Sequence, residues 1–366
     1  MSQLKVNTIR HTGATSDAIT LASDGSATAN ITNIVGNRNM VINGAMAINQ
    51  RGDTSSVTTT GYRSCDRWVT GLNSCGTWTI SQATGPTDKG FNKCIKYDCT
   101  TAHTATGTQF VQLNHRFEGN TTNRLAWGTS GAKKAVVSFW AKAEINGWSS
   151  GTKSFVVEIQ TSSSHENGNL CTLTTNNTWQ KFTIPIEAFT TSTITTTNAE
   201  SAGLIFWLDA GSDYTSGTLA SGWGNGANAN RAAGLNLGLA AHTDNNFYLT
   251  GVQFEVDEKG DGLGTEFEHL HYNDDLDNCL RYYQAFTAEF RMDNSADGVI
   301  SYHTLGLPVK MRTSPTITSS YASSYNVNTG ASLEDAFIDP QAICFGHRAS
   351  GAGTRARRDI TLSAEL

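Results

Sequence analysis

The segment 251–284 restricts the fold of this chain more than any other part of the sequence. It opens with a strand pattern in which Val252, Phe254 and Val256 alternate with polar residues, so one face of the strand is apolar. A turn rich in Gly and Asp follows, and then a short helical pattern. A β-sandwich strand that runs through an acidic loop into a single helix is an uncommon arrangement. It predicts a β domain that is followed directly by one short helix.

The short helix is expected within residues 273–286. Asn273 or Asp274 is expected to cap its start, and Asp274 and Asp275 suit the positive end of the helix dipole. Apolar residues that recur at helical spacing share one side of it: Leu276, Cys279, Leu280 and Tyr283. We therefore expect this side to pack against the rest of the molecule.

The composition favours many short strands. Thr, Ser and Asn are abundant and Gly reaches 35 residues of 366, whereas long runs of Ala, Leu, Glu and Lys are absent. Between residues 62 and 272 the strand patterns follow one another with turns between them: 77–81, 94–97, 109–113, 135–141, 154–159, 180–186, 203–208 and 247–256. All 8 Trp fall between Trp68 and Trp223, which indicates a substantial core there. The sequence predicts an all-β protein with a two-sheet sandwich over 62–272.

The rest of the chain divides around this sandwich. Residues 1–35 contain two short alternating patterns and an Asp24-Gly25 hairpin signal, but no aromatic residue and few large apolar ones. Such a segment orders by wrapping around copies of itself or on a larger assembly, or else stays a disordered tail. Residues 36–61 are expected to form a connector, and residues 287–366 a smaller C-terminal β domain.

Charge and cysteine usage exclude several classes. The net charge of -6 and the absence of a basic, aromatic-interleaved stripe argue against a nucleic-acid partner. No apolar run is long enough to cross a bilayer, so no membrane insertion is expected, and the N-terminus lacks the apolar region of a signal peptide. The 7 cysteines contain no CxxC pair and are expected to be buried thiols made in a reducing cytoplasm. Pairing of Cys65 with Cys75, or of Cys94 with Cys99, stays open.

Several short motifs resemble one known family when taken in order. They are GVQFE at 251–255, TEFE at 265–268, CLRYYQ at 279–284, MVING at 40–44, SFWAK at 138–142 and PVKMRTSPT at 308–316. Together they resemble bacteriophage tail-fibre proteins with a jelly-roll domain, a fold that is also similar to carbohydrate-binding modules. The resemblance implies an antiparallel jelly-roll β-sandwich with an extended N-terminal attachment segment, one short helix and a small C-terminal β unit.

The same resemblance implies a function and partners. The protein is expected to be made in the host bacterial cytoplasm and to sit in the virion tail as a homotrimer. Residues 1–35 are expected to bind tail adaptor or nozzle proteins, and the distal domains to contact host cell-surface polysaccharide. Two alternatives stay open: a polysaccharide-degrading tail enzyme or its carbohydrate-binding module, and a head fibre or decoration protein.

Sugar binding requires exposed aromatic rings, because the C–H faces of sugars stack on them. Trp223, Trp127 and Trp148 lie next to Gly in loop-like sequence and are the predicted glycan-binding residues. Local loop packing is the alternative for Trp223. Trp140 and Trp207 alternate within apolar strands and are expected in the core.

No catalytic residue is assigned, and the protein is not expected to be an enzyme. A glycosidase needs two carboxylates around the scissile bond. The candidates are Asp66, Glu255, Glu266 and Glu268, of which the last three fall where the family pattern gives them structural places. The sequence contains no GxSxG, P-loop or HExxH motif.

No metal site is assigned from the sequence, and two groups of residues are considered for one. His269 and His271 share one face of a strand, and two such residues are more often simply exposed. The loop that contains Asp257, Glu258 and Asp261 offers hard oxygen ligands. A structural Ca²⁺ there is the one cofactor considered, with a solvated turn as the alternative, because the spacing is not that of an EF-hand.

Overall fold

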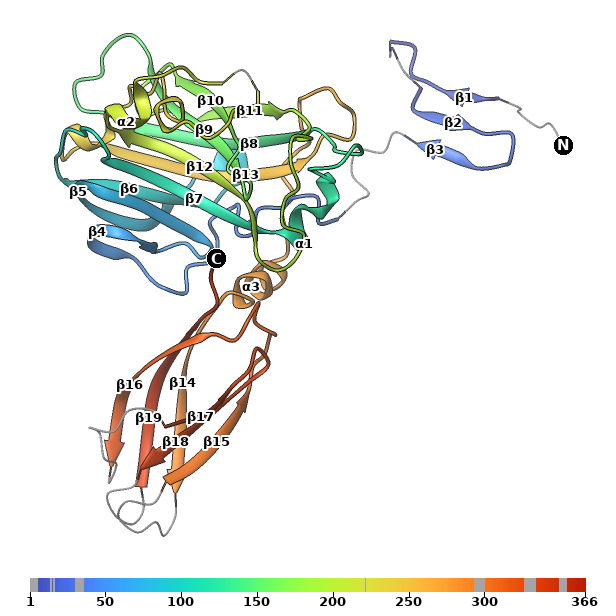
Figure 1. Ribbon diagram of the computed structural model, residues 1–366. Coiled ribbons are helices and arrows are strands. Elements are labelled where there is room, and N and C mark those ends of the chain that lie inside the picture. Colours follow the sequence, from blue (N-terminus) through green and yellow to red (C-terminus); the bar gives the residue numbers. More distant parts are fainter. Residues whose placement is uncertain are drawn as a thin grey trace. The chain divides into compact units, whose positions relative to one another are not determined.

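The computed structural model describes residues 6–13, 15, 17–29, 36–220, 222–292, 300–325, 334–348 and 354–366. The chain splits into two compact units, Met1–Arg38 and Asn39–Leu366. The first unit holds a small antiparallel sheet of β1 (Thr8–Ile9), β2 (Ile19–Leu21) and β3 (Ala27–Ala29) (Figure 1). Asp24 and Gly25 form the predicted turn between β2 and β3, with the Asp24 carboxylate accepting the Ser26 N–H at 2.8 Å. No described side chain of this unit is buried.

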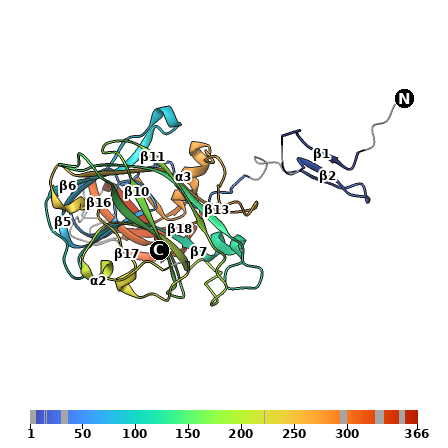
Figure 2. The ribbon, with the colours of Figure 1, turned by 90° about the horizontal axis from the view of Figure 1, so that it is seen from above.

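The second unit is built around a β-sandwich (Figures 1 and 2). Its strands are β4 (Thr54–Tyr62), β5 (Trp68–Thr84), β6 (Lys93–Thr101), β7 (Phe110–Glu118), β8 (Ala135–Glu144), β9 (Lys153–Thr161), β10 (Glu166–Leu173), β11 (Gln180–Ile186), β12 (Glu200–Ala210) and β13 (Asn246–Val256). All described pairings between them are antiparallel, in the order β10-β9-β12-β7-β5-β6-β13-β8-β11, with β4 on β5. The predicted fold class, an antiparallel jelly-roll sandwich with a short helix and a small C-terminal β unit, is confirmed.

Strand β5 belongs to both layers of the sandwich. Its residues 68–73 pair with β7, and its residues 77–84 pair with β6. We call β6, β13, β8 and β11, together with the second half of β5, the front sheet. The back sheet consists of the first half of β5 with β7, β12, β9 and β10. Short helical turns connect the strands: η1 (Thr87–Lys89), α1 (Gly119–Thr122), η2 (Asn123–Leu125), α2 (Ser212–Thr215), η3 (Asn228–Asn230) and η4 (Leu239–Ala241).

Aromatic rings fill the space between the two sheets. Phe139 of the front sheet lies 5.1 Å, centroid to centroid, from Phe206 of the back sheet, and Phe155 lies 5.4 Å from Phe247. All four side chains are fully buried. Each such ring removes roughly 150–250 Å² from water, so this aromatic layer stabilises the sandwich strongly.

The segment expected to be a connector contributes to the same core. Met40, Met46 and Ile48 are at most 1% exposed, and Met40 and Met46 pack in the main hydrophobic cluster. Residues 54–62 form strand β4, which pairs with β5. The sequence of β4, TSSVTTTGY, is too polar to be recognised as a strand from its hydrophobic pattern. Pairing with β5, rather than burial of its side chains, keeps this strand in place.

The short helix α3 (Tyr272–Leu280) follows the sandwich. Its cap differs from the expectation: His271 is the capping residue, and its Nδ1 accepts the Asn273 N–H at 3.4 Å. Asp275 and Cys279 form the buried side of the helix. Tyr283 is not helical but begins the next strand, because the chain leaves the helix at Arg281 to enter the C-terminal sheets.

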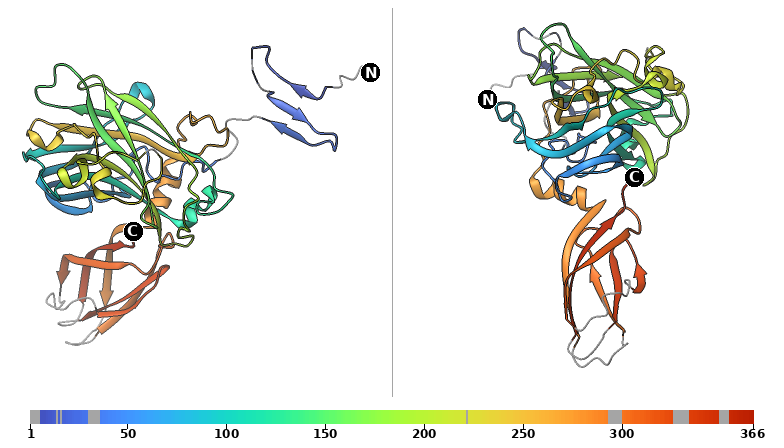
Figure 3. Two further views of the ribbon diagram at one scale, coloured as in Figure 1. Left: turned by 45° about the horizontal axis from the view of Figure 1, so that its top comes forward. Right: turned by 90° about the vertical axis from the view of Figure 1, so that its left-hand side faces the viewer.

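Two three-stranded antiparallel sheets make up the C-terminal region (Figure 3). One has the order β14-β19-β16 and the other β15-β18-β17. The strands are β14 (Tyr283–Met292), β15 (Ile300–Gly306), β16 (Thr316–Tyr325), β17 (Glu334–Ile338), β18 (Ala342–Arg348) and β19 (Thr354–Ser363). Met311, Ile343, Ile360, Leu362 and Ala364 form a separate small core between them.

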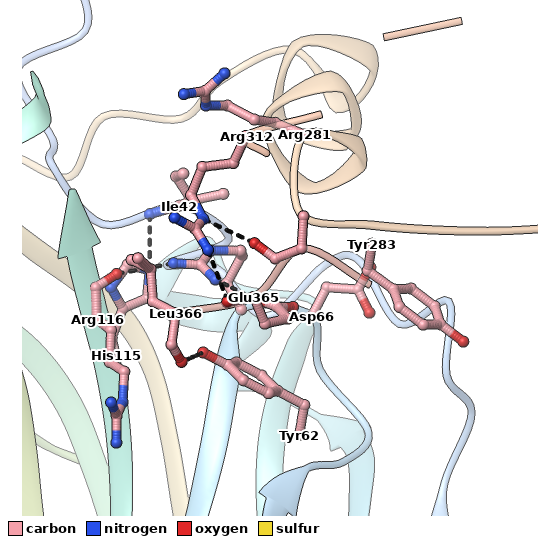
Figure 4. A network of polar contacts seen from close by, with 12 residues as sticks. Ile42, Tyr62, Asp66, His115, Arg116, Arg281, Tyr283, Arg312, Glu365 and Leu366 are labelled. Carbon is pink, nitrogen blue, oxygen red and sulfur yellow. Dashed lines mark hydrogen bonds and ion pairs between the residues drawn. The ribbon is translucent and has the colours of Figure 1, made fainter. Parts of the chain in front are cut away.

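A polar network joins the last residues of the chain to the sandwich (Figure 4). The Glu365 carboxylate binds the guanidinium groups of Arg51 and Arg67, and its own side chain is 7% exposed. The Tyr62 hydroxyl donates a hydrogen bond of 3.1 Å to the Leu366 carbonyl oxygen. Buried, charge-assisted contacts of this kind are stronger than surface ion pairs, so the final residues are held firmly.

Two further expectations concern the described helices and the thiols. No described helix is long and apolar enough to cross a membrane. All seven cysteines are free thiols, and six of them are buried. The open alternative of disulfide pairing is therefore not realised in this structure.

Candidate functional site

Trp127 and Trp148, two of the predicted glycan-binding residues, are buried. Trp127 is 3% exposed, and its Nε1 donates to the Lys133 carbonyl oxygen at 2.9 Å. Trp148 is 9% exposed, and its Nε1 donates to the Gly151 carbonyl oxygen at 3.2 Å. The glycine-containing turns fold back over these rings, so the expected exposed platforms are not present at either position.

Trp223 is half-buried and packs beside Trp127. Its ring centroid lies 4.7 Å from Phe189 and 5.1 Å from Trp127, and its Nε1 donates to the Glu187 carbonyl oxygen at 2.9 Å. The ring packs on the main core and attaches the loop around 222–226 to it. This arrangement corresponds to the loop-packing alternative, and only part of the ring is left for a ligand.

Partly exposed aromatic rings are found instead on the outer face of the front sheet. Trp140, Trp179 and Tyr248 are each half-buried, like Trp223, so part of each ring is open to solvent. Lys142 of β8 pairs directly with Tyr248 of β13, and Trp140 lies two residues before it on the same face of β8. The expectation that Trp140 belongs to the core is wrong. Trp140 lies on the same face of β8 as Ser138 and Lys142, whereas Phe139 and Ala141 point inward.

The sequence contained a signal for this face that the prediction did not use. Between the inward residues of β8 come Ser138, Trp140, Lys142 and Glu144, a set whose polar members mark the outer face. An aromatic ring at the same parity is expected outside as well. Tyr248 carries the same kind of signal, since it alternates with inward Phe247 and Leu249 in β13. Trp179 carries none, because it lies before β11 and only the pairing of β8 with β11 brings it to this face.

Charged groups lie between these rings. The Lys142 Nζ is 4.1 Å from the Tyr248 ring centroid and 5.9 Å from that of Trp179. It also contacts the Glu144 carboxylate at 2.8 Å and the Asn177 Oδ1 at 2.9 Å. The Tyr248 hydroxyl donates to Glu144 at 2.9 Å. Rings, an ammonium group, a carboxylate and an amide are thus fixed beside one another on one surface.

The contacts of Glu144 hold it in the ionised form. Burial by itself raises the pKa of this carboxyl, but the hydrogen bonds from Lys142 and Tyr248 and the charge of Lys142 outweigh it and lower the pKa below the usual value. Burial, followed by the hydrogen bond to Glu144, raises the pKa of the Tyr248 hydroxyl. At neutral pH the face therefore presents a carboxylate acceptor and a neutral phenol.

A hollow of about 270 Å³ adjoins Trp140 on the same face. We call it the sheet hollow; Lys89, Phe91, Trp140, Lys181, Glu266 and His269 are among its lining residues. The Lys89 Nζ lies 5.7 Å from the Trp140 ring centroid. Gly251 gives the hollow its shape, because a Cβ at this position would come within 2.5 Å of the Phe91 ring.

The carboxylates considered for catalysis have different surroundings. Asp66 is fully buried and binds Arg51 at 3.1 Å. Glu255 accepts the Thr265 N–H at 2.7 Å, and Glu268 accepts the Asn39 N–H at 2.8 Å. These three groups hold backbone segments together, whereas Glu266 is exposed at the sheet hollow.

The acidic loop is held together by its own backbone. Asp257 accepts the N–H groups of Gly260 and Gly262 at 2.8 and 2.9 Å, and Glu258 and Asp261 are exposed. Within the described residues, no group of three or more His, Cys, Asp or Glu side chains is arranged to hold a metal ion. Calcium binding by Asp257, Glu258 and Asp261 stays a prediction.

Comparisons with known proteins concern the fold. No protein-family model matches the sequence, and no curated protein matches it. Among solved structures, the chain is similar to a family 4 carbohydrate-binding module, with 14% identity over 59% of this chain and 99% of the other and a TM-score of 0.32. A family 11 module from Clostridium thermocellum in complex with a β-1,3-1,4-mixed-linked tetrasaccharide gives 10% identity, 59% and 98% coverage, and a TM-score of 0.27.

A xylan-binding family 22 domain from Paenibacillus barcinonensis is similar at the same level, with 10% identity, 56% and 92% coverage, and a TM-score of 0.24. TM-scores this low carry no argument about the ligand of this chain. What the structure itself defines is a mostly β protein with a jelly-roll sandwich and partly exposed aromatic rings on the outer face of its front sheet.

Proposed function

We propose that this protein is a non-enzymatic bacteriophage tail fibre that binds host cell-surface polysaccharide through the outer face of its front sheet. The observation that carries the proposal is the placement of the partly exposed rings of Trp140, Trp179 and Tyr248 on one sheet face, beside Lys142 and Glu144. The order of the family-like motifs along the chain supports the assignment to a fibre.

The chemistry of this face suits a sugar. Aromatic rings offer apolar surface for the C–H faces of a pyranose, and fixed polar groups give direction through hydrogen bonds to its hydroxyls. Glu144 offers an ionised acceptor, and Lys142 and Asn177 offer donors. A rigid sheet holds all of them, so little entropy is lost when a ligand binds.

The N-terminal unit supports assembly into a fibre. Its three short strands bury no described side chain, and Ile9 and Leu21 are 52% and 40% exposed. A small sheet without a buried face is at best marginally stable alone. We propose that three copies of residues 1–35 complete one another and bind tail adaptor or nozzle proteins. Three weak sugar sites on one fibre then gain avidity through effective concentration.

The test is binding of purified host-surface polysaccharide, measured by titration calorimetry. Replacing one ring of this face, Trp140→Ala, is expected to weaken binding about tenfold, which corresponds to about 1.4 kcal/mol. Tyr302→Ala is the matched control, because this ring is 56% exposed but lies in the C-terminal sheets. Equal affinities of the two variants would contradict the proposed face.

Two further observations separate the alternatives. Release of reducing sugar from the polysaccharide by the unmodified protein would contradict the non-enzymatic part of the proposal. Labelling of the N-terminus on intact virions is expected to mark the tail, and a label on the head would indicate a head fibre instead.

A further inference from the structure

A second hollow, of about 170 Å³, lies next to the sheet hollow. We call it the junction hollow, because three separate segments meet there. Its lining comes from the lead-in around Asn39–Ala47, from the loop around Gly90–Lys93, and from the segment around Phe267–Asp275. Glu268 and His269, which were considered above for catalysis and for metal binding, are among its lining residues. None of the predicted glycan-binding residues lies in it, and the proposed function does not use it.

The two hollows adjoin each other on either side of a short ridge of rings. Phe91, Phe267 and His269 line both of them. The ring centroids are 4.9 Å apart for Phe91 and Phe267, 5.3 Å for Phe91 and His269, and 4.8 Å for Phe267 and His269. The separation between the hollows is therefore only one layer of packed rings, and a chain-like ligand in one hollow can reach the other.

The sizes of the hollows favour an extended ligand. At 270 and 170 Å³ each is smaller than a typical small-molecule site of roughly 300–1,000 Å³, whereas both together fall within that range. One or two sugar residues suit each hollow. A whole oligosaccharide does not fit into either one alone.

The lining of the junction hollow also has the character of a sugar site. Tyr272 at the start of α3 is 57% exposed, so one face of its ring is available for stacking. Asn92 and Lys93 are exposed and offer a carbonyl, an amide and an ammonium group. Asp275 is 8% exposed, and its carboxylate accepts the Asn43 N–H at 2.9 Å. This contact fixes the helix against the lead-in and keeps the hollow open.

We propose that the junction hollow is a second subsite for the same glycan, so that the protein binds an internal stretch of polysaccharide chain that passes over the Phe91, Phe267 and His269 ridge. This inference rests on the proposed function, because it takes the sheet face as the first subsite. In addition, the affinity depends on the length of the glycan, and Tyr272 recognises the sugar residues beyond the ridge.

The experiment uses fragments of the host polysaccharide of graded length and measures their affinity for the full chain by titration calorimetry. For the unmodified protein, affinity is expected to rise at least tenfold between the shortest fragment that binds and the longer ones. Tyr272→Ala is expected to remove most of this rise and to leave the affinity for the shortest fragment unchanged. Trp140→Ala is expected to weaken every fragment.

A second variant tests the hollow without removing a contact. Asn92→Trp places a bulky ring at an exposed position of the lining and is expected to remove the same length-dependent rise. Affinities of Tyr272→Ala and Asn92→Trp that equal those of the unmodified protein at every length would overturn the second subsite. Failure of the unmodified protein to bind any fragment would instead overturn the proposed function.

Discussion

A single buried ion pair fixes the loop that covers the back sheet. Glu158 of β9 has no exposed surface and binds Arg231 at 2.9 Å, and it accepts the indole N–H of Trp207. The Arg231 guanidinium also lies 5.1 Å from the Trp207 ring centroid. Burial raises the pKa of the Glu158 carboxyl, and Arg231 only partly counteracts this. One residue of the loop, Arg231, thus supplies the counter-charge that the buried Glu158 carboxylate requires.

Removing the cation is expected to be costly in a pH-dependent way. Arg231→Met leaves Glu158 buried without its counter-charge, and breaking a buried pair from one side costs about 3–5 kcal/mol. The pKa of the Glu158 carboxyl is raised in the folded state. Its protonated form therefore adds to the free energy of unfolding below the unfolded-state pKa, and this addition is lost as the pH rises through the folded-state pKa. The loss in the variant is therefore expected to be larger at pH 8 than at pH 4.5.

Urea denaturation at the two pH values measures this difference in the free energy of unfolding. The double variant Glu158→Gln with Arg231→Met is the control, because it removes both charges. Its loss in the free energy of unfolding is expected to be the same at both pH values. A loss of equal size at both pH values in Arg231→Met would show that the charge of Glu158 is not the cause.

At the scale of the elements, a local irregularity in β13 shapes the candidate site. The pairing of β13 with β8 shifts between Thr250 and Gln253. Gly251, within this shift, has φ +62°, a left-handed conformation that glycine adopts without strain. The bulge re-aims the strand, and the Phe91 ring occupies the space that a side chain at 251 would need.

Gly251→Ala is therefore expected to destabilise the protein by about 1–3 kcal/mol, from backbone strain and from displacement of the Phe91 ring. Gly203→Ala in the neighbouring layer is the matched control. A Cβ there meets its nearest atoms at 3.9 Å, an ordinary contact, and the change is expected to cost less than about 1 kcal/mol. Chemical denaturation compares the two, and equal stability of both variants would argue against strain at Gly251.

At the scale of the whole molecule, the two units differ in what they can do alone. The unit Asn39–Leu366 contains the main core, the cluster around Trp207 and the small C-terminal core. The unit Met1–Arg38 has no buried described residue. We therefore expect the second unit to fold independently of the first, and the first to be at best marginally stable alone.

Deletion of residues 1–38 is expected to leave the thermal midpoint of unfolding of the remaining chain unchanged within a few degrees. The native mass from light scattering is expected to fall from three chains to one. A full-length protein with the mass of one chain would contradict the trimer, and a truncated protein that stays trimeric would move the assembly contacts into residues 39–366.

Much of the sandwich could be predicted because the signals are local. The predicted strand 135–141 lies within β8, and 180–186 coincides with β11. The alternation of side chains there is visible in the sequence itself. Strands β4 and β10 escaped prediction, because their residues are largely polar and only pairing with β5 and β9 makes them strands.

The sequence by itself determined the class of fold, the position of most strands and the location of the aromatic residues. It did not determine which aromatic residues face a ligand. Trp140 and Trp207 occupy equivalent places in alternating apolar strands, yet Trp207 is 1% exposed and Trp140 is partly exposed. The difference arises because a distant loop, anchored by Arg231, covers the outer face of the back sheet, while the outer face of the front sheet stays open. A period of two residues separates the two faces of a strand, but only the tertiary structure decides which face is covered.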